Sequence, residues 1–199
     1  MGHRFAEIAF TPRVRDVQTR EGSHTHYARA ELGPDTNDRL GEAERVFIEA
    51  RDSFYMASVS ETGWPYVQHR GGPVGFLKAL DERTIGFADF RGNRQYVSVG
   101  NLGHDDRVAM ILVDYPTRTR LKILGHARIV DSPDAVTMSR LAVPGYRARV
   151  ERVIVVDVVA FDWNCPQHIT PRYTTAEVEV MVAPLRERIR ELEALVRQR

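Results

Sequence analysis

The middle of the chain alternates short apolar runs with turn sequences, a pattern typical of β-hairpins. Ser60-Glu61-Thr62-Gly63 and Asp81-Glu82-Arg83 separate the members of two such pairs. Seven short strands with mostly hairpin connections favour an antiparallel barrel over repeated β-α-β units. The predicted strands are residues 53–60, 64–70, 74–80, 84–90, 107–113, 118–130 and 152–163.

Three stretches have helical rather than strand spacing. Residues 38–51 repeat apolar side chains at helical intervals, and Asp38 is the predicted N-cap. Residues 93–102 predict a short helix. Ser132-Pro133-Asp134 predicts another, which runs to about Val143, with the serine as N-cap and the proline at the first helical position. We expect these helices to lie around the barrel.

The two ends of the chain have a different character. Residues 1–37 are polar with few apolar residues, and they predict an extended arm with little regular structure, either disordered or packed over a neighbour. Near the C-terminus, Thr174-Thr175-Ala176-Glu177 matches a helix capping box. We therefore expect three parts: an arm over residues 1–37, a barrel domain over 38–175 and a C-terminal helix over 176–199.

The C-terminal helix carries a stripe of apolar residues at alternating intervals of four and three. Pro184 interrupts the segment and predicts a kink or a restarted helix. The stripe fits a helix packed on its own barrel, because so short a run is marginal alone, and it also fits a contact with a partner subunit. Its members are Val178, Val182, Leu185, Ile189, Leu192 and Val196.

Charge and cysteine content narrow the range of functions. Among 199 residues, 28 Lys+Arg and 27 Asp+Glu leave a net charge of +1, so no overall charge attracts nucleic acid or an anionic membrane. Apolar runs stay well short of the roughly 18 residues that span a bilayer. The only cysteine, Cys165, excludes an intramolecular disulfide, and no apolar signal run follows Met1-Gly2-His3-Arg4. We expect a cytoplasmic protein with no nucleic-acid or membrane partner.

One segment concentrates the residues that an anionic ligand needs. His69-Arg70-Gly71-Gly72 and Lys78 are followed by Ala88-Asp89-Phe90 and then by Asn93-Arg94-Gln95. Arginines offer a planar fork to phosphate oxygens, and glycines let the main chain approach a ligand. Asn93-Arg94-Gln95 falls at the start of the predicted short helix, where free N–H groups favour an anion. Solvated surface arginines are the alternative interpretation.

This segment resembles pyridoxamine 5'-phosphate oxidases. Residues 78–95 match, without a gap, the family's stretch from a strand lysine to a Ser-Arg-Lys phosphate motif. The resemblance implies that Arg94 binds the phosphate of FMN, with Asn93 and Gln95 in place of the serine and lysine, and that the backbone of Ala88 and Asp89 borders the flavin. Upstream, residues 67–70 are similar to the family's arginine-containing strand, although Gly71-Gly72 lengthen the interval to Lys78.

The resemblance implies a mainly β fold, a six- to seven-stranded antiparallel split β-barrel with peripheral helices and a C-terminal helix. It also implies a homodimer with two FMN molecules in the clefts between subunits. Trp163 is similar to the tryptophan that closes the family's last strand, and Arg172 to the arginine beyond it. Lys122 and residues 163–167 are therefore the candidates for the second chain's contribution to each flavin site.

The resulting hypothesis is an FMN-dependent oxidoreductase that acts on a small organic substrate. The substrate is not expected to be pyridoxamine phosphate, because residues 141–147 and 165–168 do not match the family's substrate-binding motifs. A flavin- or haem-binding protein without turnover and a deazaflavin-dependent reductase are the alternatives. No catalytic acid or base is assigned. No metal site is expected either, since the Cys165–His168 pair has no second pair and zinc takes about four ligands.

Overall fold

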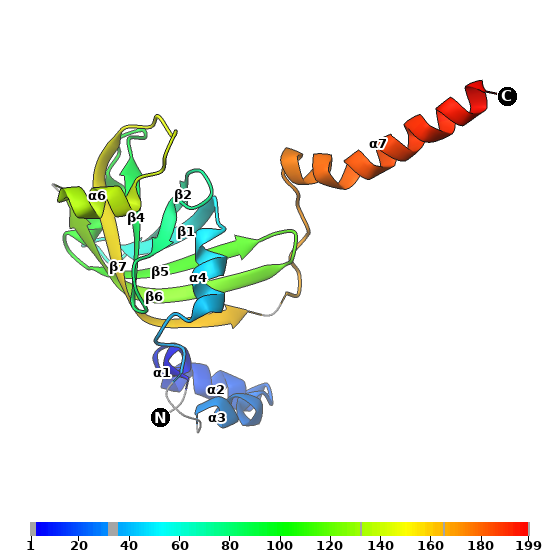
Figure 1. The fold of residues 1–199 in the computed structure, drawn as a ribbon. Helices are drawn as coiled ribbons and strands as arrows, with labels where there is room; N and C mark the ends of the chain where they lie inside the picture. Colours follow the sequence, from blue (N-terminus) through cyan, green and yellow to red (C-terminus); the bar gives the residue numbers. More distant parts are fainter. Residues whose placement is uncertain (1–2, 32–35, 132, 165, 199) are drawn as a thin grey trace. The chain divides into compact units, whose positions relative to one another are not determined.

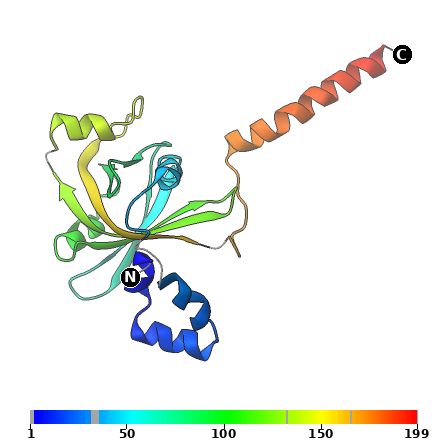
Figure 2. The same ribbon diagram turned by 60° about the horizontal axis from the view of Figure 1, so that its bottom comes forward.

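The computed structural model describes residues 3–31, 36–131, 133–164 and 166–198. Its main element is a seven-stranded antiparallel sheet with strand order β2-β1-β5-β6-β7-β4-β3 (Figures 1 and 2). The sheet curls into a barrel, but β2 and β3 remain edge strands, so the barrel is split. The expected fold class is thereby confirmed. The strands are β1 (Ser53–Val59), β2 (Pro65–Gly71), β3 (Leu77–Ala79), β4 (Thr84–Phe90), β5 (Arg107–Asp114), β6 (Thr119–Val130) and β7 (Val150–Asn164).

Each predicted strand is present, and β3 departs most from its expected bounds. It has three residues rather than the predicted 74–80. The reason is a turn just before it: the Phe76 N–H donates to the Pro73 carbonyl at 3.0 Å, and Gly75 has a φ of 83° that suits glycine. The chain therefore bends where a continuous strand was expected.

Aromatic side chains fill the inside of the barrel. The Phe54 ring stacks on Phe76 with centroids 5.7 Å apart and meets Phe87 edge-on at 5.1 Å. All three rings are buried, as is Ile48 of the helix α4 (Glu42–Glu49). Contacts among residues from β1, the turn before β3, β4 and α4 thus hold opposite sides of the split barrel together.

Strand β7 is buried on both faces over residues 153–156, which explains the apolar run Val153-Ile154-Val155-Val156. Ile154 and Val156 belong to the barrel core. Val153 and Val155 point the other way and pack with Leu141. Leu141 ends the helix α6 (Ala135–Leu141), so this helix covers the outer face of β7. Side chains of a strand alternate between faces, and here each face meets an apolar partner.

The predicted N-cap of α4 is wrong. The helix starts after Gly41, whose N–H donates to Glu44 Oε2 at 2.9 Å. Asp38 instead accepts a hydrogen bond from Arg83 Nη2 at 2.6 Å, which ties the entry of the helix to the turn between β3 and β4. A distant arginine thus binds the carboxylate that local sequence suggested as a cap.

The N-cap of α6 (Ala135–Leu141) is Asp134, whose carboxylate accepts from the backbone N–H groups of Val136 and Thr137. The predicted cap, Ser132, lies outside the described residues. Hydrogen bonds from Thr137 and Val136 hold the pKa of Asp134 below its ordinary value, since they favour the ionised carboxylate.

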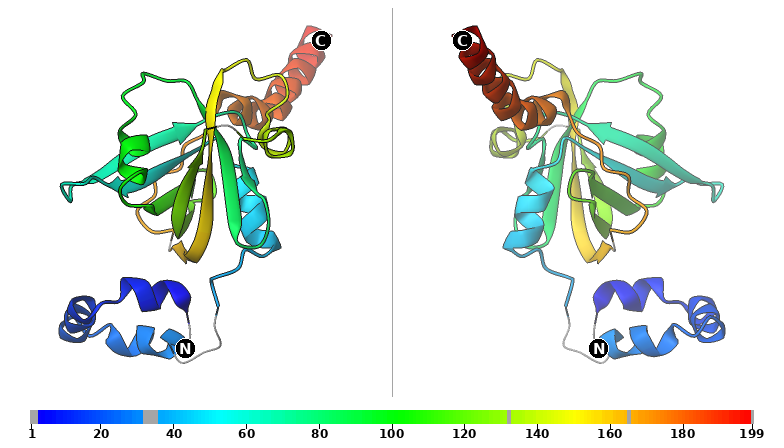
Figure 3. Two further views of the ribbon diagram at one scale, coloured as in Figure 1. Left: turned by 90° about the vertical axis from the view of Figure 1, so that its left-hand side faces the viewer. Right: turned by 90° about the vertical axis from the view of Figure 1, so that its right-hand side faces the viewer.

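The prediction of an extended arm over residues 1–37 is wrong. The described part forms three short helices, α1 (Arg4–Ala9), α2 (Pro12–Arg20) and α3 (His24–Glu31), grouped beside the barrel (Figure 3). The Thr11 side chain accepts from the Val14 N–H at 3.4 Å and caps α2. Pro12 stands at the first position of that helix, where proline starts a helix instead of breaking it.

The chain divides into two compact units, each described by itself. One contains Met1–Val113 and Arg120–Cys165, and the other contains Asp114–Thr119 and Pro166–Arg199. The N-terminal helices therefore belong to the barrel unit. No helix within the described ranges combines the length and the apolar character that crossing a membrane requires.

The second unit contains the helix α7 (Thr175–Arg197) and its predicted capping box. Thr174 Oγ1 accepts from the Glu177 N–H at 3.2 Å, and Glu177 Oε2 accepts from the Thr174 N–H at 2.7 Å. The capping box is thus confirmed. The helix is continuous through Pro184, so it does not restart there.

Candidate functional site

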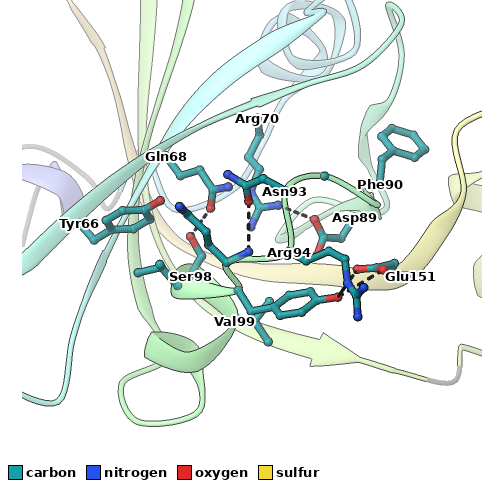
Figure 4. A pocket seen from close by; sticks show the side chains of 14 residues that line it. Tyr66, Gln68, Arg70, Asp89, Phe90, Asn93, Arg94, Ser98, Val99 and Glu151 are labelled. Carbon is teal, nitrogen blue, oxygen red and sulfur yellow. Dashed lines mark hydrogen bonds and ion pairs between the residues drawn. The ribbon is translucent and has the colours of Figure 1, made fainter.

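A cavity of about 230 Å³ lies between β2, β4 and the start of the helix α5 (Val97–Leu102) (Figure 4). We call it the Arg70–Arg94 cavity. Its lining comes from β2, the end of β4, the loop 91–96, α5 and the start of β7. The lining residues are Tyr66, Gln68, Arg70, Asp89, Phe90, Gly92, Asn93, Arg94, Gln95, Tyr96, Val97, Ser98, Val99 and Glu151.

Alternation along β2 decides which of its side chains reach the cavity. Tyr66, Gln68 and Arg70 share one face and line it. Gln68 Oε1 accepts from the Ser98 hydroxyl at 2.6 Å, which ties the strand to α5. His69 lies on the opposite face, where its ring packs edge-on against Tyr55 with centroids 5.4 Å apart. Arg70 is therefore in the site and His69 is outside it.

At the floor of the cavity, one carboxylate, that of Asp89, pairs with two buried arginines, of which Arg70 lines the cavity and Arg152 does not. Arg70 Nη1 is bonded to Asp89, and the two side chains are 13% and 8% exposed. Arg152 Nε lies 3.7 Å from Asp89 Oδ2. The Nε atoms of Arg70 and Arg152 are buried with no hydrogen-bond partner among the described residues. Because buried donors are rarely left unpaired, this floor has unused capacity for an anionic ligand or for water.

The loop before α5 differs from the predicted helix start. The helix begins at Val97 rather than near Asn93, and both Arg94 and Tyr96 have left-handed φ angles, 63° and 53°. Such angles are unfavourable for side-chain-bearing residues. Asn93 Oδ1 accepts from the Gln95 N–H at 3.1 Å and helps to hold the turn. Asn93-Arg94-Gln95 therefore lies in a constrained loop and not at a helix N-terminus.

A chain of hydrogen bonds holds the Arg94 side chain. Arg94 Nε donates to Tyr96 Oη at 3.2 Å, and this hydroxyl donates to Glu151 Oε2 at 3.2 Å. The hydrogen bond to Tyr96 raises the pKa of Arg94 above its ordinary value, which keeps the guanidinium charged. The Tyr96 ring lies under the Arg152 guanidinium, 4.9 Å from centroid to Cζ. Among the described residues, Arg94 Nη1 and Nη2 have no hydrogen-bond partner, so they are available to a ligand.

The charges of this group favour an anion. Four arginines face three carboxylates, which leaves one positive charge in excess; the arginines are Arg70, Arg91, Arg94 and Arg152, and the carboxylates are Asp89, Asp131 and Glu151. The excess is placed at Arg94, because Asp89 is bound to both buried arginines. Arginine's planar array of N–H donors suits two phosphate oxygens at once. The arrangement can thus bind a phosphate at the mouth and a polar edge of a ligand at the floor.

Other residues expected in the site lie elsewhere. The Ala88 side chain is buried in β4 and does not line the cavity, and the predicted contact of the Ala88 backbone with the flavin stays a prediction. Lys78 Nζ donates to the Ala142 carbonyl at 3.0 Å and does not line the cavity. Gly71 ends β2 and Gly72 follows it; a Cβ at Gly72 would come within 2.7 Å of the Phe76 ring, so this glycine serves packing.

Three expected residues are not among those that line the Arg70–Arg94 cavity. Lys122 and Trp163 line a second cavity, next to the N-terminal helices. Arg172 belongs to the other unit, where its guanidinium lies over the Tyr115 ring at 4.9 Å. Their predicted role as the second chain's contribution to a flavin site stays a prediction.

Sequence reasoning missed several residues of the site. Tyr66 and Gln68 follow from strand alternation once Arg70 is placed, so that signal was present. Tyr96 and Ser98 fall within the predicted short helix but were not singled out. Glu151 carried no signal, because it lies at the start of β7, far from the phosphate segment in the chain. In the described parts of the chain, no cluster of three or more metal-ligating side chains occurs.

Comparison with models of known protein families shows to which family the chain belongs. The family model for pyridoxamine 5'-phosphate oxidase matches residues 40–161, more than half of the chain. The chain belongs to the pyridoxamine 5'-phosphate oxidase family. The matched range contains every residue that lines the Arg70–Arg94 cavity, so this cavity lies within the family's shared domain.

Three solved structures are among those to which the chain is similar. HupZ from Group A Streptococcus aligns with a TM-score of 0.52 and 13% identity, over 67% of this chain and 99% of that chain. A putative pyridoxamine 5'-phosphate oxidase from Lactobacillus delbrueckii aligns with a TM-score of 0.47 and 19% identity, over 63% and 94%. An FMN-binding protein from Syntrophomonas wolfei aligns with a TM-score of 0.47 and 14% identity, over 74% and 95%. No curated protein sequence matches the chain.

Proposed function

We propose that this member of the pyridoxamine 5'-phosphate oxidase family is an FMN-dependent oxidoreductase that acts on a small organic substrate. The observation that carries the proposal is the Arg70–Arg94 cavity. It gathers Arg70, Asp89, Asn93, Arg94 and Gln95, residues that the family resemblance assigned to FMN, around one excess positive charge. When bound there, FMN supplies the hydride or electron transfer.

The residues of the cavity fit the parts of FMN. The Arg94 Nη atoms have no partner among the described residues, and the loop 91–96 places them at the mouth, where they suit the phosphate. At the floor, the Nε atom of Arg70, which has no hydrogen-bond partner among the described residues, is a donor for polar atoms of the cofactor. Gln68 and Tyr66 line the side of the cavity formed by β2. The Tyr96 hydroxyl positions Arg94, and Glu151 positions Tyr96.

The size of the cavity supports the homodimer that this function requires. Complete small-molecule sites enclose roughly 300–1,000 Å³, whereas this cavity has about 230 Å³ in one chain. A single chain therefore holds only part of FMN. A second copy completes the site in the proposal, with Lys122, Trp163 and Arg172 as its candidate residues.

The deciding experiment is an absorbance spectrum of purified protein, before and after addition of FMN and removal of the excess. We expect retained flavin bands in the wild type and binding roughly ten- to a hundredfold weaker in Arg94→Gln, because a charged hydrogen bond to the phosphate is lost. Arg39→Gln is the matched control: Arg39 is an exposed arginine that pairs with Glu82, and its FMN affinity should equal that of the wild type.

Three other results of these measurements would contradict the proposal. A protein that binds no FMN but develops a haem Soret band, or that binds a deazaflavin, would support one of the alternative cofactors. If bound FMN is not bleached by NAD(P)H or by any organic donor tested, the protein is a flavin carrier rather than an oxidoreductase. An Arg94→Gln variant with unchanged FMN affinity would remove the phosphate site from the cavity.

A further inference from the structure

A second cavity, of about 430 Å³, lies between the N-terminal helices and the ends of β6 and β7. We call it the N-terminal cavity. Among the described residues, it shares no lining residue with the Arg70–Arg94 cavity. Its volume falls within the range of roughly 300–1,000 Å³ that is typical of complete ligand sites. One chain therefore encloses enough space for a small molecule here without help from a second copy.

Aromatic side chains form the walls of the N-terminal cavity. Phe10, at the end of α1, meets Tyr27 of α3 edge-on with centroids 5.4 Å apart. On the barrel side, Trp163 Nε1 donates to Glu44 Oε1 at 2.7 Å, and the indole packs edge-on against Phe47 at 4.9 Å. Because Glu44 occupies the indole N–H, Trp163 offers the cavity only apolar ring surface. Such walls suit a flat aromatic ligand.

A compact polar group lies among these aromatic walls. Lys122 Nζ is 2.9 Å from Asp162 Oδ2 and 4.6 Å from the centroid of Phe5. His3 Nε2 is 3.4 Å from Asp162 Oδ1, while His3 Nδ1 is buried with no hydrogen-bond partner among the described residues. An ammonium group has three N–H donors, and Asp162 takes one. Lys122 thus has donor capacity left for an anionic oxygen, and His3 Nδ1 can donate as well when the imidazole carries a proton on that nitrogen.

We propose that the N-terminal cavity binds a small planar aromatic compound that carries an anionic group such as a carboxylate. The aromatic ring lies among Phe10, Tyr27 and Trp163, and the anionic group meets Lys122 and His3. Within one chain the two cavities have separate linings. Because Lys122 and Trp163 are also the proposed contribution of a second copy to the FMN site, binding is tested in FMN-free protein. The N-terminal helices, which supply most of the lining, thereby gain a function as the wall of a binding site.

Trp163 provides a direct probe, because the chain has two tryptophans and the other, Trp64, is 76% exposed on a β-hairpin. In a Trp64→Phe protein, Trp163 fluorescence is titrated with 4-nitrobenzoate and with 4-nitrobenzyl alcohol, which has the ring without the charge. Cyclohexanecarboxylate, which has the charge without the ring, is tested in competition. We expect saturable quenching by 4-nitrobenzoate, with affinity at least tenfold higher than for the other two compounds.

The contribution of the charge is tested with the chain's two lysines. Lys122→Met should weaken 4-nitrobenzoate binding at least tenfold, while Lys78→Met, which removes the lysine outside both cavities, should leave it unchanged. His3→Gln gives a second test at a position outside the barrel core. Absence of saturable quenching, equal affinity for all three compounds, or unchanged affinity in both Lys122→Met and His3→Gln would overturn the proposal. The readout is tryptophan fluorescence in FMN-free protein, so failure of the FMN proposal would be seen separately by absorbance.

The apolar stripe of α7 carries a second inference from independent observations. No residue of α7 is buried, and Leu185, Ile189 and Leu192 are 63%, 55% and 46% exposed. In heptad notation, the a positions are all β-branched and two of the three d positions are leucine, the combination that favours parallel two-stranded coiled coils. The a residues are Val182, Ile189 and Val196, and the d residues are Val178, Leu185 and Leu192.

Charges beside the stripe agree with a parallel pair of identical helices. In this register, Arg188 occupies a g position and Glu193 the following e position, which face each other between parallel helices and carry opposite charges. Pro184 falls at a c position, away from the stripe, so the hydrogen bond that it cannot make is not at the contact face. We infer that α7 pairs in parallel with α7 of a second copy of this chain. This inference rests on the homodimer of the proposed function, which raises the local concentration of so short a helix.

Disulfide trapping tests the pairing. In a Cys165→Ser background, which removes the native cysteine, Leu192→Cys at a d position should form a covalent dimer on mild oxidation. Arg190→Cys, on the outer face two residues away, should not. Equal cross-linking of the two variants, or none in a protein whose mass in solution is that of a dimer, would overturn the inference while leaving the barrel dimer intact. A monomeric mass would instead contradict the homodimer itself.

Discussion

Arg70 of β2 and Asp89 of β4 form a buried ion pair between strands that are not neighbours in the sheet. Backbone hydrogen bonds do not join these two strands, because four strands separate them in the sheet order. The ion pair therefore bridges the split of the barrel by side chains. It also sets the floor of the Arg70–Arg94 cavity, so the same contact serves stability and the site.

Asp89→Asn should lower the free energy of unfolding by about 3 kcal/mol, because it leaves Arg70 and Arg152 buried without their shared counter-charge. Urea unfolding followed by circular dichroism measures this. Asp157→Asn is the control: Asp157 is 57% exposed and its pair with Arg128 spans 3.9 Å, so the change should stay within about 1 kcal/mol. Similar effects of the two substitutions would contradict the bridging role of Asp89.

Tyr96→Phe should weaken FMN binding roughly three- to tenfold, since it removes the hydroxyl that joins Arg94 to Glu151 but keeps the ring under Arg152. Quenching of FMN fluorescence on titration with protein measures the affinity. Tyr146→Phe, which alters a tyrosine packed on Phe90 through its ring, should bind FMN as the wild type does. A larger loss in Tyr146→Phe than in Tyr96→Phe would show that the hydroxyl does not position Arg94.

Gly125→Ala should destabilise the protein by about 1–3 kcal/mol. Its Cβ would lie 2.6 Å from the Asp157 carbonyl and 2.7 Å from Val156 Cγ1, at the irregularity where β6 pairs with β7. Gly100→Ala is the matched control in α5, where a Cβ meets nothing within 4 Å, so alanine should stabilise by roughly 0.5–1 kcal/mol. Thermal melts of both variants check the two signs, and a stable Gly125→Ala protein would refute the close packing at this position.

The N-cap of α6 predicts a specific dependence on acid. Hydrogen bonds from Thr137 and Val136 lower the pKa of Asp134 in the folded state, so its contribution to stability is present above the unfolded pKa of about 3.9 and disappears as the pH falls through the lowered folded value. Asp134→Asn keeps a capping oxygen but cannot titrate. The difference in melting temperature between wild type and variant should therefore shrink as the pH falls from 7 to 3; a constant difference would contradict this assignment.

Sequence patterns predicted the barrel because the signals for its strands and turns come from residues that are close together in the chain. Alternation, hairpin turns and the Thr174–Glu177 capping box depend on residues close together in the chain, and all are present. The cap of α4 was missed because Arg83, more than forty residues away, binds Asp38. The N-terminal helices were missed because their apolar residues are few, although Thr11-Pro12 carried a start signal.

The residues of the candidate site also fall into those that the sequence predicted and those that it did not. Arg70, Asp89, Asn93, Arg94 and Gln95 were predicted by motif and are gathered in one cavity. Glu151 could not be predicted, because only the pairing of β4 with β7 brings it to the loop 91–96. His69 was expected beside Arg70 from sequence proximity, yet adjacent residues of a strand face opposite ways. The pairing of distant strands and the alternation of side chains along a strand thus account for the differences between the predicted and the observed site residues.

The position of β7 in the sheet has a consequence for how the chain folds during its synthesis. β4 pairs with β3 on one side and with β7 on the other, from Thr84 opposite Asp157 onward. The hairpin of β3 and β4 is therefore joined to the rest of the sheet only through β7, the last strand to leave the ribosome. Until β7 is available, the apolar side chains of Ile85 and Phe87 lack the β7 residues against which they pack. The nascent barrel then has an unpaired strand edge and exposed apolar surface, which favour aggregation. Closure of this non-local pairing is the slow step that topology imposes on the fold.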